Sequence, residues 1–312
     1  MYFEIAGISV NPLIPPLVAF LISAFTSTGG VSGAFIILPF QVSVLGFTSP
    51  AVSATNQLYN VVAIPSGVYR YIREGRMVWP LTWIVIAGTL PGVLIGALVR
   101  INFLSDPSSF KVFAGFVLLY IGFRILKEIL SQKKPKTLEA EEKFNEIVKN
   151  FRSQQSKVKL PKAKVLTFNL NTLEYEFVGE NFKVKTIPIF LISCLVGIVG
   201  GIYGIGGGAI MAPIYVTFFN LPVYTVAGPA LMGTFITSVF GVIIYQILAV
   251  IYPAMSIAPD WKLGFLFGIG GLIGMYVGAR LQKYLPAKLI KLILAISILF
   301  LGLRYVLNII WK

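Results

Sequence analysis

The 312-residue chain is 56% hydrophobic and only 12% charged, with a mean hydropathy of +0.83. This balance excludes a soluble fold, and the continuous apolar runs predict an all-α polytopic membrane protein rather than a β-barrel. The net charge of +14 is interpreted as topology signals in loops. The lipid bilayer is therefore expected as a partner, and nucleic acid is not.

Histidine is absent, and Cys194 is the only cysteine. These counts exclude catalytic imidazole, zinc sites with His or several Cys ligands, and intrachain disulfides. None of the twelve acidic residues is expected deep in an apolar segment, which disfavours a proton relay through a buried carboxylate. We therefore expect no metal, no cofactor and no enzymatic activity. The start of the chain lacks the basic residues of a signal peptide, so the first apolar segment is expected in the mature protein.

The chain contains an internal repeat. Aligning its two apolar regions pairs GGVSGAFIILPF with GIGGGAIMAPIY, and farther along it pairs Arg124 with Arg304. A series of such matches in the same order indicates duplication. The resulting parts are a first membrane repeat (1–130), a cytoplasmic insertion (131–185) and a second membrane repeat (186–312).

Each repeat contains five apolar segments, of which the first two are short and joined through glycine. In the first repeat the segments cover 12–27, 31–46, 49–70, 78–100 and 108–130. In the second they cover 187–202, 206–219, 222–248, 261–283 and 287–310. The last three of each repeat are long enough to cross a hydrocarbon core of ~30 Å at ~1.5 Å per residue. The first two fit either two crossings or one re-entrant hairpin.

An odd number of segments predicts that the two repeats are inverted, and the charges agree. Arg70, Arg73 and Arg76 follow the third segment of the first repeat, whereas the matching loop around 249–261 has no Lys or Arg. After the fourth segment the second repeat is the more basic, beginning at Arg280. The positive-inside rule then places these basic loops and the insertion in the cytoplasm and both termini outside. Inverted repeats with short, glycine-broken segments are typical of secondary transporters.

The insertion reads as a small α+β element. Residues 138–151 predict a surface helix, and the alternation over 164–185 predicts a short hairpin. We interpret it as a solvated insertion. A regulatory role, or a partner protein that docks there, is the alternative.

The glycine-rich break between the first two segments of each repeat is a candidate anion site. Glycine lets the backbone approach a ligand closely, and a helix that begins after a break presents unpaired N–H groups and the positive end of its dipole. Two such breaks facing each other would hold an anion near the midplane. The alternative is that the glycines serve only close packing or a turn. The candidate residues are Thr28, Gly29, Gly30, Ser32 and Gly33 in the first break, and Tyr203, Gly204, Gly206, Gly207 and Gly208 in the second.

The third segments add a polar face with helical spacing. It consists of Asn56, Gln57 and Asn60 in the first repeat and of Thr234 and Thr237 in the second. Amides and hydroxyls donate to oxyanions, so these side chains are candidate substrate ligands; hydrogen bonding between helices is the alternative.

Two stripes of small residues repeat in the fourth segments. Glycines at every fourth position allow helices to approach closely, so we assign both stripes to helix packing. The stripes are Gly88, Gly92 and Gly96, and Gly270, Gly274 and Gly278.

The sequence resembles the sulfite exporter TauE/SafE family of membrane transporters, also called TSUP. The resemblance rests on GGVSGAFIILPF and GIGGGAIMAPIY, on AVSATN followed by Ser66 and Gly67, and on REGRMVW. It covers both apolar regions and implies transport of small sulfur-containing anions such as sulfite, thiosulfate or organosulfonates. Two departures are Pro229, where the first copy has Thr55, and the length of the insertion.

We therefore expect a carrier in the cytoplasmic membrane that exports a small sulfur oxyanion by alternating access at a midplane site. The alternatives are a passive anion channel and a membrane-embedded enzyme built on Cys194, Tyr203 or a lysine. The sequence leaves open which anion is carried, whether H⁺ or Na⁺ is coupled, and whether the chain forms a homodimer.

Overall fold

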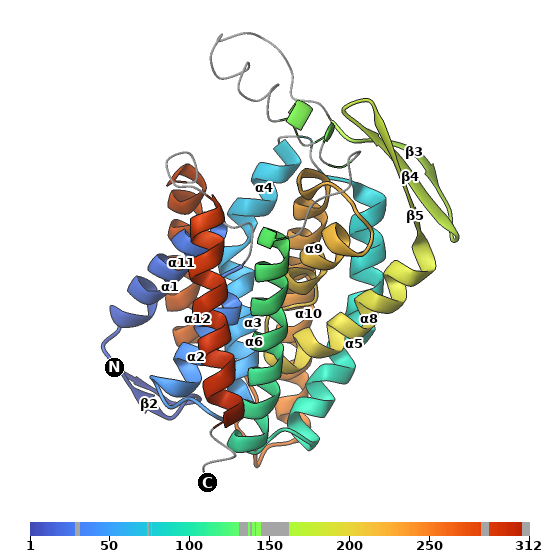
Figure 1. Cartoon of the computed structure of the whole chain (residues 1–312). Helices are drawn as coiled ribbons and strands as arrows, with labels where there is room; N and C mark the ends of the chain where they lie inside the picture. The colour runs from blue at the N-terminus through green and yellow to red at the C-terminus, as the bar shows by residue number, and fades with distance from the viewer. Residues whose placement is uncertain are drawn as a thin grey trace.

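The computed structural model describes residues 1–28, 32–73, 75, 77–130, 137, 139–140, 142–144, 162–281 and 287–307. This part of the chain is mostly helical, as predicted, and a small antiparallel sheet stands at one end of the helical bundle (Figure 1). We call this the sheet end and the other the opposite end.

The first two helices form a helical hairpin. A two-stranded hairpin that hydropathy does not predict, β1 (Tyr2–Phe3) with β2 (Ile8–Ser9), lies at the opposite end and leads into α1 (Ile14–Thr28). The next helix, α2 (Ala34–Ser43), returns to the same end (Figure 1). Ten helical residues span ~15 Å, about half of a hydrocarbon core, so α2 reaches only the middle of the bundle.

The predicted third segment is divided in two. Helix α3 (Ala51–Ala63) ends before Pro65, and α4 (Pro65–Arg73) begins there, because proline has no N–H to continue the helical hydrogen bonds. The fourth and fifth segments, α5 (Trp79–Asn102) and α6 (Pro107–Leu130), lie within two residues of their predicted bounds.

The insertion contains a three-stranded antiparallel sheet rather than the predicted hairpin. Its strands, in the order β3–β4–β5, are β3 (Lys164–Phe168), β4 (Thr172–Phe177) and β5 (Glu180–Lys185). The hydroxyls of Tyr175 on β4 and Thr225 lie 2.8 Å apart in a buried hydrogen bond, which fastens the sheet to the bundle. Burial raises the pKa of Tyr175, so its hydroxyl stays protonated at neutral pH.

Most of the predicted surface helix over 138–151 lies outside the described residues. Phe144, which is described, is buried against the rings of Phe177 and Tyr224, with ring centroids 5.4 and 4.3 Å apart. The insertion thus packs on the membrane part of the chain through aromatic contacts.

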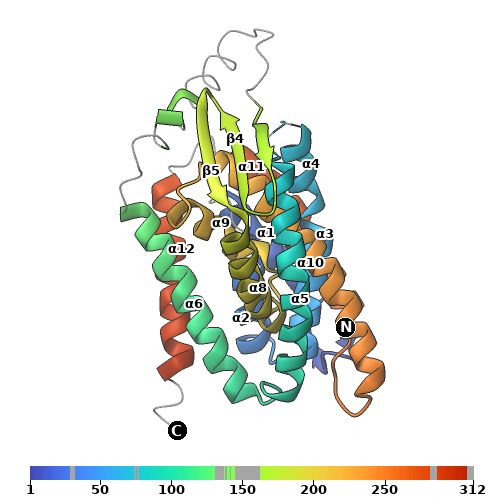
Figure 2. The same ribbon diagram turned by 90° about the vertical axis from the view of Figure 1, so that its right-hand side faces the viewer.

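The second half begins at the sheet end. Helix α8 descends directly from β5 beside α5 (Figure 2), and the segment after α9 returns to the insertion, where the Asn220 carbonyl accepts a hydrogen bond from Thr137 at 2.8 Å. The pair α8–α9 is therefore a second helical hairpin. The helices are α8 (Thr186–Tyr203), α9 (Gly208–Thr217), α10 (Val223–Ile251), α11 (Trp261–Leu281) and α12 (Ala287–Leu307).

The halves are interleaved rather than side by side. Helix α1 packs along α11, and α8 packs along α5, while α6 packs on α12 and α3 on α10 (Figure 1). The two small-residue stripes form the close contacts. A Cβ on Gly88 would lie 2.6 Å from the Phe190 carbonyl oxygen, and Gly92 and Gly96 likewise face the α8 backbone. On α11, Gly270 and Gly274 face the backbone of α1 in the same way, so the predicted packing is confirmed at these five glycines.

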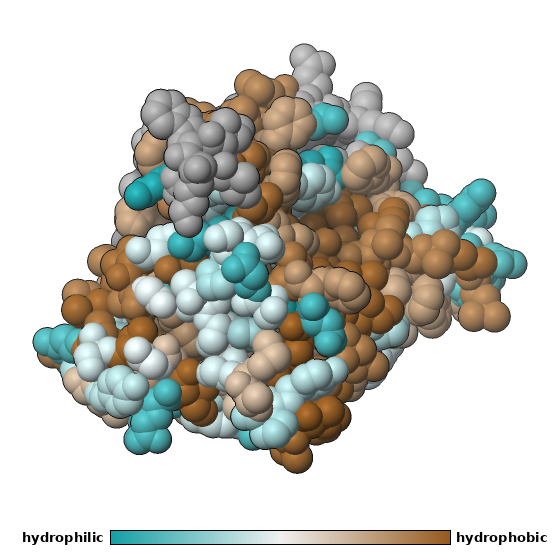
Figure 3. Space-filling view, turned by 90° about the horizontal axis from the view of Figure 1, so that it is seen from below, coloured by the Kyte–Doolittle hydropathy of each residue, from teal (hydrophilic) through white to brown (hydrophobic). Residues whose placement is uncertain are grey.

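Five of the described helices, α5, α6, α8, α10 and α11, are long and apolar enough to cross a membrane. Large apolar side chains lie exposed on their outer faces, for example Phe116 and Phe123 on α6 and Leu195 on α8, as expected for a surface that contacts lipid. Seen from the opposite end, polar and weakly hydrophobic residues gather in the middle of the face, with hydrophobic residues around them (Figure 3).

Among the described residues one acidic side chain, Asp260, is buried, and it lies just before the start of α11 rather than deep in an apolar segment, as predicted. Asp260 is 3% exposed at the start of α11. Its carboxylate accepts hydrogen bonds from the backbone N–H of Leu263 at 3.0 Å and of Ala6 at 3.2 Å, and the Asp260 N–H donates to Thr55 at 2.9 Å. Asp260 therefore caps α11 and ties it to the N-terminal hairpin.

Candidate functional site

The first break is described only in part. Gly29 and Gly30 lie outside the described residues, and Thr28 is described only as the last residue of α1. Ser32 is buried and its hydroxyl donates to Asn60 Oδ1 at 2.9 Å. Gly33 faces α1 and α3, since a Cβ there would lie 2.9 Å from the Tyr59 hydroxyl.

At the glycines of the second break an added Cβ would meet protein atoms. Gly204 and Gly206 have φ angles of +80° and +69°, which glycine adopts at little cost. Gly204 lies against the Ser53 backbone, Gly207 against the Thr89 side chain and Gly208 against the Ala230 carbonyl. These contacts are those of the packing alternative, and binding of substrate by these glycines stays a prediction.

Two asparagines of α3 join both breaks. The Asn56 amide donates to the carbonyls of Ala34 at 3.0 Å and Gly204 at 3.1 Å. The Asn60 amide donates to the Ile205 carbonyl at 3.1 Å, while its oxygen accepts from Ser32. We call Asn56 and Asn60 the amide clamp. Both side chains are fully buried, so the sequence-predicted polar face does meet the breaks.

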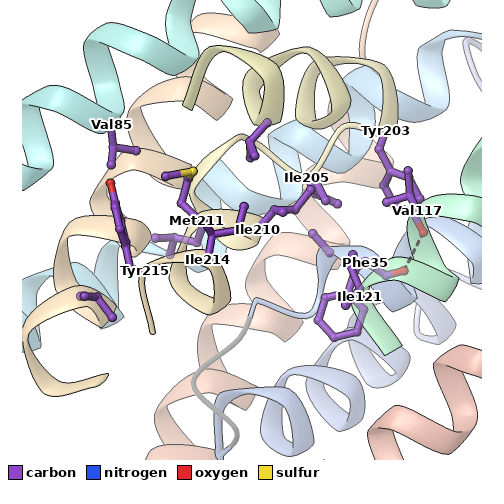
Figure 4. Packing of buried hydrophobic residues seen from close by; sticks show 14 of the residues in the cluster. Phe35, Val85, Val117, Ile121, Tyr203, Ile205, Ile210, Met211, Ile214 and Tyr215 are labelled. Carbon is purple, nitrogen blue, oxygen red and sulfur yellow. Dashed lines mark hydrogen bonds between the residues drawn. The ribbon is translucent and has the colours of Figure 1, made fainter. Parts of the chain in front are cut away.

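A further contact brings the tips of the two helical hairpins together. The Tyr203 hydroxyl, at the end of α8, donates to the Phe35 carbonyl at the start of α2 at 2.9 Å (Figure 4). Gln41 on α2 donates to Asn56 Oδ1 at 3.3 Å. The hairpins therefore enter from different ends of the bundle and meet in its interior.

The α10 threonines support the second break. Thr237 Oγ1 accepts a hydrogen bond from the Gly207 N–H at 3.3 Å and donates to the Gly233 carbonyl at 2.6 Å. Thr234 donates to the Ala230 carbonyl at 2.9 Å, within its own helix. The structure thus brings Thr237 to the break directly and places Thr234 beside Gly206 and Gly208.

Gln57 differs from its neighbours on α3. Its side chain is fully buried against Gly241 of α10, yet neither Oε1 nor Nε2 has a hydrogen-bond partner in the described part of the chain. A buried amide without partners costs ~1–3 kcal/mol, so this group is either strained or available to a ligand.

Sequence reasoning missed two buried arginines because it treated them as topology signals or repeat markers. Arg100 is fully buried, lies 3.8 Å from the centroid of the Phe110 ring, and donates to Ser53 and to the carbonyls of Thr48 and Leu104. Arg124 is 6% exposed on α6. A cation inside an apolar segment was the available signal, since such residues are rare and functional.

Short helical hairpins that meet inside a bundle of long apolar helices are typical of multi-pass membrane transporters. The family model described as sulfite exporter TauE/SafE matches residues 16–305. The chain belongs to this family, and is a membrane transporter of it.

Three curated relatives agree with this assignment. A probable membrane transporter protein, YunE, of Bacillus subtilis is 22% identical to this chain. The match covers 89% of this chain and 90% of the length of YunE. The probable membrane transporter protein YdhB of the same organism is 30% identical, over 36% of this chain and 43% of its own. A probable membrane transporter protein of Haemophilus influenzae is 30% identical, over 40% of this chain and 44% of its own. No solved structure matches the chain.

Proposed function

We propose that the protein is a secondary transporter that exports a small sulfur-containing oxyanion, namely sulfite, thiosulfate or an organosulfonate, across the cytoplasmic membrane. Transport occurs by alternating exposure of a midplane site between the two breaks. The observation that carries the proposal is the amide clamp, through which Asn56 and Asn60 join the tips of hairpins that enter from different ends. Separation of either hairpin from the clamp opens the site to one side.

The two halves act as inverted repeats in this mechanism. Support comes from the exchange of partners, since α1 of the first half packs on α11 of the second and α8 of the second packs on α5 of the first. The stripes at Gly92 and Gly274 form these two contacts. Helices α3 and α10, which carry the polar faces, cross each other between the hairpins.

Gln57 is the group best placed to bind the anion at this site. Its amide nitrogen has two N–H donors, which suit the oxygens of an oxyanion. A neutral donor also releases its ligand more easily than a buried cation would. An inside-negative potential favours anion exit by ~2.3 kcal/mol per charge per 100 mV, so export needs no coupled ion.

Flux in proteoliposomes tests the function. We expect saturable efflux of one of sulfite, thiosulfate and ethanesulfonate when only a membrane potential is imposed, with sulfate and chloride carried at least tenfold more slowly. Counterflow, in which an unlabelled anion on one side drives labelled anion uphill, separates a carrier from a channel. Absence of flux of every sulfur anion, with or without pH and Na⁺ gradients, contradicts the proposal.

The same assay tests Gln57. Gln57→Leu is expected to keep or raise thermal stability, because it removes two unpartnered buried polar atoms, and to raise the half-saturating concentration of the transported anion at least fivefold. The exposed Gln at 246 serves as the control, since Gln246→Leu leaves both quantities unchanged. Unchanged affinity in Gln57→Leu removes Gln57 from the site.

We place the sheet end in the cytoplasm and the termini outside, because Arg70 and Arg73 lie at the sheet end of α4. In a Cys194→Ser background, Leu170→Cys in the insertion and Phe103→Cys at the opposite end provide single exposed thiols. A membrane-impermeant maleimide is expected to label Phe103→Cys in intact spheroplasts and Leu170→Cys only after lysis. The reverse pattern overturns the orientation.

A further inference from the structure

A cleft beside the hairpin tips contains a buried cation that the mechanism above does not use. The cleft lies between α6, the start of α2, the second break and α9. Figure 4 shows Phe35, Ile121, Ile205 and Ile210 of its lining gathered around this region. Apart from Arg124, the lining is apolar or aromatic.

Arg124 is enclosed without hydrogen bonds at two of its guanidinium nitrogens. Its side chain is 6% exposed, and among the described residues Nε and Nη2 have no hydrogen-bond partner. The guanidinium carbon lies 4.6 Å from the Phe218 ring centroid and 5.7 Å from that of Tyr120, so its described neighbours are the faces of two aromatic rings. No described carboxylate forms an ion pair with it.

Burial of an unpaired cation is costly, and cation–π contacts offset only a small part of that cost. Arginines near the end of a membrane helix commonly extend to the lipid headgroups, but a side chain 6% exposed has not done so. The missing partner is therefore a group that the described part of the chain does not supply. A guanidinium with two adjacent free N–H donors matches two oxygens of a single oxyanion.

We propose that the Arg124 cleft is an oxyanion-binding subsite that holds a monovalent anion with a short apolar tail, of the alkanesulfonate class, next to the hairpin tips. One cation balances one negative charge, so monoanions are favoured over dianions such as sulfate. The apolar walls formed by Ile121, Ile205 and Pro213 contact the tail. This inference rests on the proposed function, for which it supplies the site from which the anion passes to the tips.

Equilibrium binding of ethanesulfonate and of sulfate to the purified full-length protein in detergent tests the subsite. We expect Arg124→Gln to weaken ethanesulfonate binding at least tenfold, and Arg124→Lys to weaken it about threefold, because lysine keeps the charge but loses the two-pronged geometry. Wild-type protein is expected to bind sulfate at least tenfold more weakly than ethanesulfonate.

Three control variants separate a local site from other effects. Lys127→Gln removes an exposed cation one turn away on α6, Arg304→Gln removes the exposed arginine that aligns with Arg124 in the repeat, and Glu128→Gln removes the acid four residues on. All three are expected to bind ethanesulfonate within twofold of wild type. If Arg124→Gln fails to fold, as judged by gel filtration, the comparison of Arg124→Lys with Lys127→Gln decides.

Several outcomes overturn the subsite: equal binding by wild type and Arg124→Gln, an equal loss in Lys127→Gln, tighter binding of sulfate, or no binding of ethanesulfonate. Flux measured in parallel keeps the two proposals apart. If wild-type flux is saturable and Arg124→Gln does not change it, the subsite is contradicted and the transporter proposal stands. If ethanesulfonate binding depends on Arg124 but the wild-type protein shows no flux, the transporter proposal is contradicted and the subsite stands.

Discussion

Asn56→Ala is expected to reduce anion flux at least tenfold and to lower the melting temperature of the purified protein. Asn56 donates to the carbonyls of both hairpin tips, at Ala34 and Gly204, and is fully buried. Its truncation removes one donor from each of two buried carbonyls and the acceptor of the Gln41 amide, which costs ~1–3 kcal/mol for each buried group left without a partner and separates the tips. Flux per folded molecule in proteoliposomes and thermal unfolding in detergent measure the two effects.

Asn102→Ala is the matched control. Asn102 also donates its amide to a carbonyl, that of Leu98 at 2.9 Å, but it is exposed at the end of α5. The same chemical change there is expected to leave flux and melting temperature unchanged. Wild-type flux in Asn56→Ala would show that the clamp has no part in transport, and would leave the mechanism without its central observation.

Gly92→Val is expected to remove most folded protein from the membrane. A Cβ at Gly92 would overlap the Cys194 carbonyl and lie 2.8 Å from the Ile198 nitrogen, both on the backbone of α8. Backbone cannot rotate away as a side chain can, so the helices must separate. We expect a loss of about 3 kcal/mol or more, at the upper end for overpacked cores. Yield after gel filtration and thermal unfolding provide the measurement.

Leu94→Val, two residues away on the same helix, controls for the β-branched side chain. Leu94 is 38% exposed, so its shortening removes little packing and is expected to change yield and stability only slightly. A Gly92→Val protein as stable as Leu94→Val would contradict the close approach of α5 and α8.

The sequence predicts the helices well because burial in a membrane requires long apolar runs with intact backbone hydrogen bonds. The bounds of α5, α6 and α11 follow from hydropathy alone. The end of α3 before Pro65 could have been predicted, since proline breaks helical hydrogen bonds; average hydropathy over 49–70 concealed it.

The site is less predictable because its partners are distant in the chain. Residue spacing places Asn56 and Asn60 on one face of a helix, but their acceptors at Gly204 and Ile205 lie about 150 residues away. The same spacing includes Gln57, which packs against Gly241 and bonds to neither break. Residue spacing alone therefore cannot distinguish Asn56 and Asn60, which bond to the breaks, from Gln57, whose amide has no hydrogen-bond partner among the described residues. Arg124 shows a related limit, since burial depends on how α6 meets α9.

The exchange of helices between halves means that packing partners are synthesised at different times. Helix α1 is synthesised first, but its packing partner α11 is synthesised almost last, and the glycine face of α5 has no partner until α8 follows the insertion. The first half therefore remains in the membrane with the glycine face of α5 and the facing surface of α1 uncovered. A nascent chain that stops before α8 cannot form its core, so folding is completed only after most of the chain has left the ribosome.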